Sequence, residues 1–210
     1  MRAPPATLRS RPRRNALVLA GMLLVAATSA FSTPVAGTIE QWNTGGDLAT
    51  WTNAPTFGTA QTNLLNPGGW LRLTFPPIDP LAVTNDAMFS ASPTNTGDFS
   101  AINLRFDYRS VFFLTDNTVR FRASSGNIWD LAFDNAATNQ WESHSVLFNY
   151  GEGWSSTTGG LGLSDFTTDL QNVTAIGISI YSALGATANQ FYDLDNWEYW
   201  EDATVIPEPG

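Results

Sequence analysis

Residues 101–108 read Ala-Ile-Asn-Leu-Arg-Phe-Asp-Tyr, and this stretch decides the fold class. Its apolar residues Ile102, Leu104, Phe106 and Tyr108 alternate with polar ones. Successive side chains of a β-strand point to opposite faces of a sheet, so the pattern predicts a strand with one face in a core and one polar face.

Strand signals continue on both sides of this stretch. They cover 70–75, 118–122, 128–133, 141–148, 175–181 and 191–200, with turns rich in Gly, Asn and Pro between them. The one helix-like segment is 164–171, where Ser164 would cap a first turn that contains Asp165. Short strands at this spacing favour an all-β, antiparallel β-sandwich with one short helix.

The N-terminus predicts export. Residues 1–14 contain five arginines and no acid, residues 16–27 are an apolar run, and Thr-Ser-Ala follows at 28–30. A basic segment, about a dozen apolar residues and a small-residue exit form a secretory signal peptide. A membrane anchor would need about 20 apolar residues. We therefore expect residues 1–30 to be removed by cleavage after Ala30, with Ala36 as the second choice.

Removal of the signal peptide leaves a strongly acidic chain. Five arginines, no lysine and nineteen acidic residues remain, which gives a formal charge of −14. Nucleic acid is not expected as a partner, because it needs clustered basic residues. The chain has no cysteine, which favours either a bacterial source or a core large enough to fold without disulfides.

Four segments in order resemble the laminin B domain, also called laminin domain IV. They are AMFSASPTNTGDFSAINLRFDYR (87–109), QWESHSVLFNYGEGW (140–154), DFTTDLQNVTAIGISIYS (165–182) and DLDNWEYW (193–200). The resemblance implies a jelly-roll sandwich over 37–203, similar in shape to galactose-binding domains and carbohydrate-binding modules. It also implies a noncatalytic protein of adhesion or extracellular matrix. Residues 38–80 match only loosely, and the usual cysteine-rich flanking modules are missing.

The C-terminal residues 204–210 resemble a second family signal. Val-Ile-Pro-Glu-Pro-Gly at 205–210 is similar to the start of a PEP-CTERM sorting signal of Gram-negative bacteria that make exopolysaccharide. In that family a membrane span and an arginine cluster follow, and neither does here. The chain is then either truncated at this point or released without an anchor. The resemblance implies a secreted or outer-envelope protein that meets the export and sorting machinery.

Acidic residues suggest a structural calcium site. Ca²⁺ prefers six to eight oxygen ligands from carboxylates and carbonyls. Jelly rolls of the resembling class often bind one Ca²⁺ between the turn of the first strand and the last strand. Glu40, Asp47 and Asp195 occupy the equivalent places, so they are the candidate ligands.

Aromatic residues suggest a glycan site, because ring faces stack on sugars beside polar hydrogen-bonding groups. Trp51, Trp70, Trp129 and Tyr150 are the candidates. Four arginines, Arg105, Arg109, Arg120 and Arg122, could form a cross-strand polar ladder with Asp107.

The last strand offers the one candidate for catalysis. Asp193 and Glu198 resemble the paired acids of some retaining glucanases of sandwich fold, which need carboxylates about 5–5.5 Å apart. The alternative is structural: a bulge at Asp195-Asn196 would let Leu194 and Trp197 both point inward. We do not expect an enzyme.

The leading hypothesis is a noncatalytic extracellular adhesion or matrix module that binds polysaccharide or matrix components. The first alternative is a glycoside hydrolase that uses Asp193 and Glu198. The second is a structural envelope or biofilm protein without a small ligand.

Overall fold

The computed structural model describes residues 34–37, 39–54, 63–76, 85–111, 117–134, 137–181 and 188–201, all within one unit, Phe31–Gly210. The predicted signal peptide and the PEP-CTERM-like tail lie outside the described residues. In the described part of the chain, no helix is long and apolar enough to cross a membrane.

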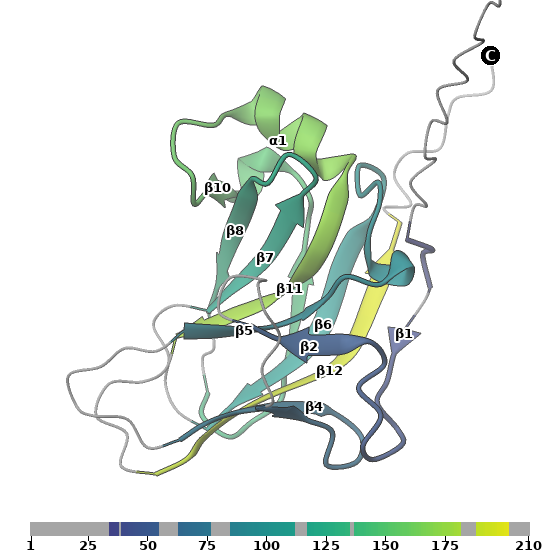
Figure 1. Ribbon diagram of the computed structural model, residues 1–210, viewed down its shortest axis with the longest axis vertical. Helices are drawn as coiled ribbons and strands as arrows, with labels where there is room; N and C mark the ends of the chain where they lie inside the picture. Colours follow the sequence, from purple (N-terminus) through teal and green to yellow (C-terminus); the bar gives the residue numbers. More distant parts are fainter. Residues whose placement is uncertain are drawn as a thin grey trace, which may run out of the picture. The chain divides into compact units, whose positions relative to one another are not determined.

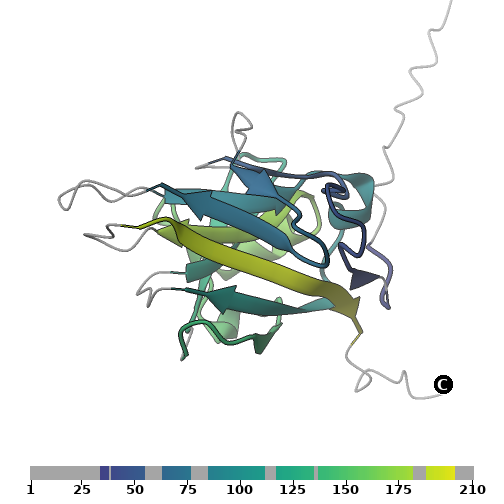
Figure 2. The ribbon, with the colours of Figure 1, turned by 90° about the horizontal axis from the view of Figure 1, so that it is seen from below.

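The described residues form a sandwich of two antiparallel sheets (Figure 1). The first sheet has the order β3 (Leu64–Leu65), β4 (Leu71–Phe75), β12 (Gln190–Trp200), β6 (Asn103–Ser110) and β9 (Glu142–Val146), with β1 (Ile39–Glu40) also paired to β12. In Figure 2 the long yellow strand β12 runs beside blue β4. The second sheet has the order β10 (Ser155–Ser156), β8 (Ile128–Phe133), β7 (Asn117–Ala123), β11 (Val173–Tyr181), β5 (Asn85–Ser90) and β2 (Trp51–Asn53).

The fold class expected from the sequence is confirmed: the described residues form an all-β jelly-roll sandwich with one α-helix, α1 (Leu163–Leu170). Two short 3-10 turns, η1 (Pro93–Asn95) and η2 (Tyr150–Glu152), complete the described elements. The helix begins one residue earlier than predicted. Gly162, not Ser164, is its N-cap, and the Gly162 N–H donates to the Asp165 carboxylate at 3.0 Å.

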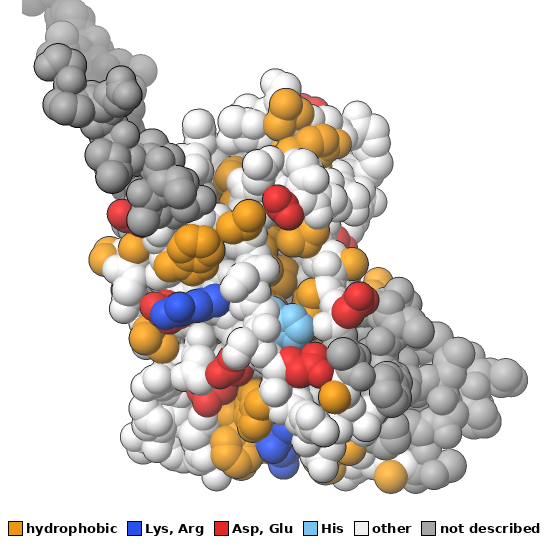
Figure 3. All heavy atoms as spheres, turned by 180° about the vertical axis from the view of Figure 1, so that it is seen from behind, with side chains coloured by type: hydrophobic (Ala, Val, Ile, Leu, Met, Phe, Trp, Pro, Cys, Tyr) orange, Lys and Arg blue, Asp and Glu red, His pale blue; other side chains and the backbone are white. Residues whose placement is uncertain are grey.

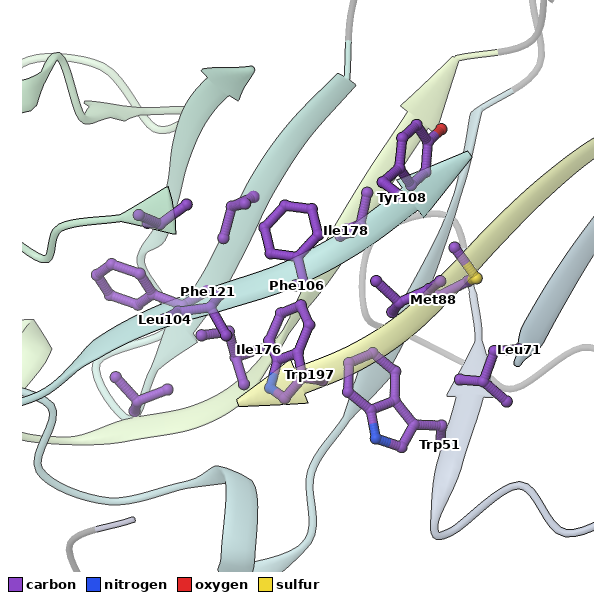
Figure 4. Packing of buried hydrophobic residues seen from close by; sticks show 14 of the residues in the cluster. Trp51, Leu71, Met88, Leu104, Phe106, Tyr108, Phe121, Ile176, Ile178 and Trp197 are labelled. Carbon is purple, nitrogen blue, oxygen red and sulfur yellow. The ribbon is translucent and has the colours of Figure 1, made fainter. Parts of the chain in front are cut away.

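The core lies between the two sheets. Leu104, Phe106 and Tyr108 of β6 are buried as the alternation predicts. In Figure 4 the side chains of Phe106 and Trp197 from the first sheet and Phe121 and Ile176 from the second gather between the strands. Aromatic rings contribute much of this apolar burial, at roughly 150–250 Å² each.

Strand β12 carries the bulge that its sequence suggests. Its register with β6 shifts between Asp195 and Glu198, and Asn196 has a left-handed backbone with φ of 50°. Because of this shift, Leu194 and Trp197 are both buried although three positions separate them. The acidic residues on either side of the bulge therefore keep the outward direction.

Candidate functional site

The outer face of the first sheet carries a buried ion cluster. Asp193 of β12 lies opposite Arg72 of β4 on one side and Arg109 of β6 on the other. Arg72 donates from Nε and Nη2 to the two Asp193 oxygens at 2.7 and 2.8 Å. Arg109 donates from Nε and Nη2 to Asp193 Oδ2 at 2.9 and 2.5 Å. Three strands distant in sequence thus meet at one carboxylate.

Burial of the Asp193 carboxylate makes its pairing with the two arginines necessary. The Asp193 side chain has no exposed surface, and the side chains of Arg72 and Arg109 are 24% and 20% exposed. A buried carboxylate is costly unless cations and hydrogen bonds compensate it. The hydrogen bonds to Asp193 raise the pKa of Arg72 above its usual value. With two guanidinium groups and one carboxylate, the cluster keeps one net positive charge.

Two tryptophans flank the arginines. The Arg109 guanidinium carbon lies 4.6 Å from the Trp141 ring centre and 5.4 Å from that of Trp70. Arg72 lies 5.7 Å from the Trp70 ring centre. These distances fit cation–π contacts. We call Trp70, Arg72, Arg109, Trp141 and Asp193 the Trp–Arg cluster.

Exposed aromatic surface distinguishes this cluster from the core. Trp141 is 39% exposed, one of the few large apolar side chains at the surface of the described chain. Trp70 is half-buried, and its indole Nε1 has no hydrogen-bond partner. The two rings stand edge to face with their centres 6.3 Å apart.

A polar pocket continues the same face. It has a volume of about 400 Å³, and its lining includes Arg105, Asp107, Ser143, His144, Asn196 and Glu198. Figure 3 shows acidic and basic side chains gathered near a histidine on one face of the molecule. Because Asp107 and Arg109 are alternate residues of β6, the pocket and the Trp–Arg cluster share one sheet face. We call them together the outer strip.

Hydrogen bonds fix the polar groups of this pocket. Asp107 accepts hydrogen bonds from Ser143 Oγ at 2.5 Å and from Asn196 Nδ2 at 2.6 Å. Arg105 pairs with Glu198 at 2.6 Å. The left-handed backbone of Asn196 places its side chain beside Asp107. The bulge of β12 therefore shapes the pocket.

The predicted polar ladder of arginines is wrong. Arg105 and Arg109 lie in the first sheet, whereas Arg120 and Arg122 lie in β7 of the second. Arg120 pairs with Asp130 at 2.7 Å. Sequence alternation indicates which residues of one strand share a face, but it could not assign the strands to sheets.

Two of the four predicted glycan-stacking residues are buried, so that role is wrong for them. Trp51 is 2% exposed and stands edge-on to Trp42 and Trp197 in the core. Trp129 is 0% exposed and donates from Nε1 to Asp169 at 2.8 Å. Neither ring face can reach a sugar in this fold.

The other two candidates lie apart. Trp70 belongs to the Trp–Arg cluster, whereas Tyr150 is half-buried in η2 and packs on Trp129 and Phe166. Arg72, Arg109 and Trp141 were not predicted to bind a ligand. A sequence signal existed for Arg72, because Trp70 and Arg72 are two residues apart in a strand pattern and so share a face.

The three predicted calcium ligands occupy different settings. Glu40 accepts hydrogen bonds from Trp51 Nε1 and from Asn95 Nδ2, and burial raises the pKa of its carboxyl. Asp47 accepts from the Ala49 N–H at 2.9 Å. Asp195 lies opposite Asp107, and burial raises its pKa, with the Asp107 charge adding to the effect.

These three acids are not brought together. Among the described residues, no group of three or more His, Cys, Asp or Glu could hold a metal ion. Calcium binding stays a prediction, without an assigned set of carboxylate ligands.

The predicted catalytic acids are also apart. Asp193 lies opposite Arg109 and Glu198 opposite Arg105, so the two acids are four positions apart along β6, about 13 Å at the rise of a strand. Retaining glycosidases need roughly 5 Å. Each acid is also held in an ion pair. The geometry rules out Asp193 and Glu198 as a retaining pair.

Comparison with known proteins finds structures of similar fold. No protein-family model matches the chain, and no curated protein matches it. The L4b domain of human laminin alpha-2 has a TM-score of 0.50 at 9% identity, over 72% of this chain and 90% of that one. This likeness is one of fold alone, and it agrees with the laminin resemblance of the sequence.

Carbohydrate-binding modules of Clostridium thermocellum are also similar. The family 11 module of the cellulase Lic26A-Cel5E has a TM-score of 0.49 at 13% identity, over 80% of this chain and 97% of that one. The family 30 module of Cel9D-Cel44B has a TM-score of 0.46 at 13% identity, over 79% and 99%. At these levels we take nothing about function from them.

Proposed function

We propose that this chain is a noncatalytic, exported polysaccharide-binding module that acts in adhesion or in an extracellular matrix. Its ligand lies along the outer strip. The observation that carries the proposal is the Trp–Arg cluster, in which two partly exposed tryptophans flank two arginines. Beside it lies a polar pocket of about 400 Å³.

The chemistry of the outer strip suits sugars. The apolar face of a pyranose ring stacks on an aromatic ring, and its hydroxyls need donors and acceptors nearby. Trp141 offers an exposed ring, and the half-buried Trp70 stands beside it. Asp107, Ser143 and Asn196 supply further polar groups. An open sheet face accommodates a polymer better than a closed cavity does.

The noncatalytic part of the proposal is supported by the placement of the acids. Asp193 is enclosed by two guanidinium groups and cannot act as a nucleophile or proton donor without breaking four hydrogen bonds. We place the protein outside the cytoplasm, in the outer envelope or surroundings of a Gram-negative bacterium. This location rests on the signal-peptide and PEP-CTERM-like segments of the sequence.

Affinity electrophoresis of the purified protein in a panel of soluble polysaccharides tests the proposal. We expect retardation by at least one polymer, and the dissociation constant should rise about tenfold or more on Trp141→Ala, as for a binding hot spot. Trp70→Ala should weaken binding in the same direction. Leu163→Ala is the control, because Leu163 is 60% exposed but lies in α1.

Two results would contradict the proposal. One is retardation by no polymer in the panel. The other is binding that Trp141→Ala and Trp70→Ala leave unchanged. Self-association without any dependence on sugar would instead favour the structural envelope protein.

A further inference from the structure

We propose that the polysaccharide bound along the outer strip is acidic, and that the carboxylate of a uronic acid residue is held by Arg72 and Arg109 of the Trp–Arg cluster. This inference rests on the proposed function and deepens it, because it names the chemical class of the ligand. Unused hydrogen-bond donors, an unbalanced positive charge and the flanking aromatic rings carry it.

The donors of the two arginines are only partly used. Both guanidinium groups bond to Asp193 through Nε and Nη2. These bonds to Asp193 do not use the Nη1 group of either arginine. A guanidinium carries five N–H donors and no acceptor, so each unused group can serve only an acceptor. Two unused groups on neighbouring arginines suit an acceptor with two oxygens, such as a carboxylate.

The charge of the cluster points to an anion. Arg105 is matched one to one by Glu198, and Arg120 by Asp130. Arg72 and Arg109, by contrast, share the single carboxylate of Asp193. The cluster therefore keeps one positive charge in a chain that is otherwise strongly acidic. A neutral sugar would leave this charge uncompensated, whereas a uronate would balance it.

Partial burial of the two arginines strengthens their preference for an anionic ligand. The two arginine side chains are one fifth to one quarter exposed and lie against aromatic rings. Charge–charge attraction is stronger where water is partly excluded. Charge-assisted hydrogen bonds to a carboxylate are about twice as strong as neutral ones. The exposed ring of Trp141, 4.6 Å from the Arg109 guanidinium, would stack on the same sugar whose carboxylate the arginines hold.

The test compares polymers that differ only in charge. The purified full chain is titrated with polygalacturonate and alginate, and with the same polymers after reduction of their carboxyl groups. A neutral β-glucan and a sulfated polymer complete the panel. We expect a uronate polymer to bind at least tenfold more tightly than its reduced form, with affinity that falls as salt rises.

Variants locate the effect in the cluster. Arg109→Gln should bring the affinity ratio between the uronate polymer and its reduced form close to one, while binding of the reduced form persists. Arg120→Gln is the matched control, because Arg120 is also an ion-paired arginine, held by Asp130, but lies in β7 of the second sheet, away from the outer strip. If Arg109→Gln does not fold, the proposal is tested by Arg72→Gln and by the comparison of polymers on the unchanged protein.

The outcomes separate the two proposals. Equal binding of the uronate and reduced polymers, or binding of neutral polymers alone, would overturn the acidic ligand and leave polysaccharide binding intact. Tighter binding of the sulfated polymer than of any uronate would overturn the assignment to a carboxylate. Binding of no polymer would overturn both proposals.

Discussion

Asn66 occupies a position that resembles a cation site. Its Nδ2 lies 2.9, 2.9 and 2.7 Å from the carbonyl oxygens of Trp42, Thr44 and Asp47, and its Oδ1 accepts from the Gly68 N–H. An amide group has only two hydrogens for three acceptors. A single side chain thus gathers three carbonyl oxygens of the 42–47 segment, as a bound cation would.

This geometry predicts that two substitutions of Asn66 differ in how their stability responds to Ca²⁺. Asn66→Ala leaves the carbonyl groups without a donor, so it should lower the free energy of unfolding by about 1–3 kcal/mol whether or not calcium is present. Asn66→Asp places a carboxylate among the carbonyl oxygens. The variant protein should therefore be less stable in the presence of a chelator and regain stability in millimolar Ca²⁺. Thermal unfolding with and without Ca²⁺ measures both effects.

The unchanged protein is the reference in the same experiment. A melting temperature of Asn66→Asp that does not depend on Ca²⁺ would show that the three carbonyl oxygens cannot serve as metal ligands. A Ca²⁺-dependent melting temperature of the unchanged protein would support the calcium site expected from the sequence.

His144 predicts a dependence of stability on pH. Its ring stacks on Phe106, lies edge-on to Phe133, and has an Nε2 without a partner. Burial lowers the pKa of His144, although Glu142 and Asp107 act in the opposite direction. A histidine whose pKa is lower in the folded state takes up its proton more readily when unfolded, so its contribution to stability is lost as pH falls through about 6.5.

The substitution His144→Phe keeps an aromatic ring and removes the titration. Between pH 7.5 and 5, the unfolding midpoint in urea should fall more for the unchanged protein than for His144→Phe. Buried carboxyls with raised pKa values, such as Glu40 and Asp195, favour acid pH in both proteins, so the difference between the two curves is the readout. Parallel curves would contradict the prediction.

Among the elements, most of the longer strands were predictable and their partners were not, and β5 at Asn85–Ser90 was missed. The 101–108 pattern became β6 at Asn103–Ser110, and 128–133 became β8 with the same bounds. Alternation fixes which residues of a strand share a face, and this is a local property. Pairing of β4, β12 and β6 joins residues more than eighty positions apart, so the Arg72–Asp193–Arg109 ion cluster has no local signal.

Strand β11 shows how closely its neighbour approaches. A Cβ atom added to Gly177 would lie 2.0 Å from the Met88 carbonyl oxygen and 2.6 Å from Phe89 Cα of β5. These are backbone atoms of a paired strand, so they cannot move without breaking the ladder. The glycine in the isoleucine-rich sequence of 175–181 therefore has a structural reason.

Gly177→Ala should destabilise the protein strongly. We expect a loss of at least about 2 kcal/mol in the free energy of unfolding, because the added methyl group overpacks a rigid site. Gly45→Ala is the control, because its added Cβ would make only an ordinary contact, 3.8 Å from Gly68 Cα. Denaturant unfolding measures both variants, and equal midpoints for the two would show that β5 and β11 can separate without cost.

Over the whole molecule, the eight tryptophans divide into two groups that the sequence does not distinguish. Trp42, Trp51, Trp129, Trp154 and Trp197 are at most 3% exposed, whereas Trp70, Trp141 and Trp200 are not buried. Strand β2 has only three residues, too few for alternation to show which face is inside. The face of Trp51 depends on its sheet partner, so its burial follows from the assembled sandwich.

Oxidation of tryptophan by N-bromosuccinimide, mapped by peptide mass, should follow this division. Trp141 should react first because it is 39% exposed, Trp70 and Trp200 more slowly, and the five buried rings only after unfolding. A bound polysaccharide should protect Trp141 and Trp70, because both belong to the Trp–Arg cluster. Trp200 is the internal control, since it lies opposite Asn103 at the other end of β12. Protection of Trp200 without protection of Trp141 would move the ligand away from the cluster, and oxidation of Trp51 in the folded protein would contradict the core itself.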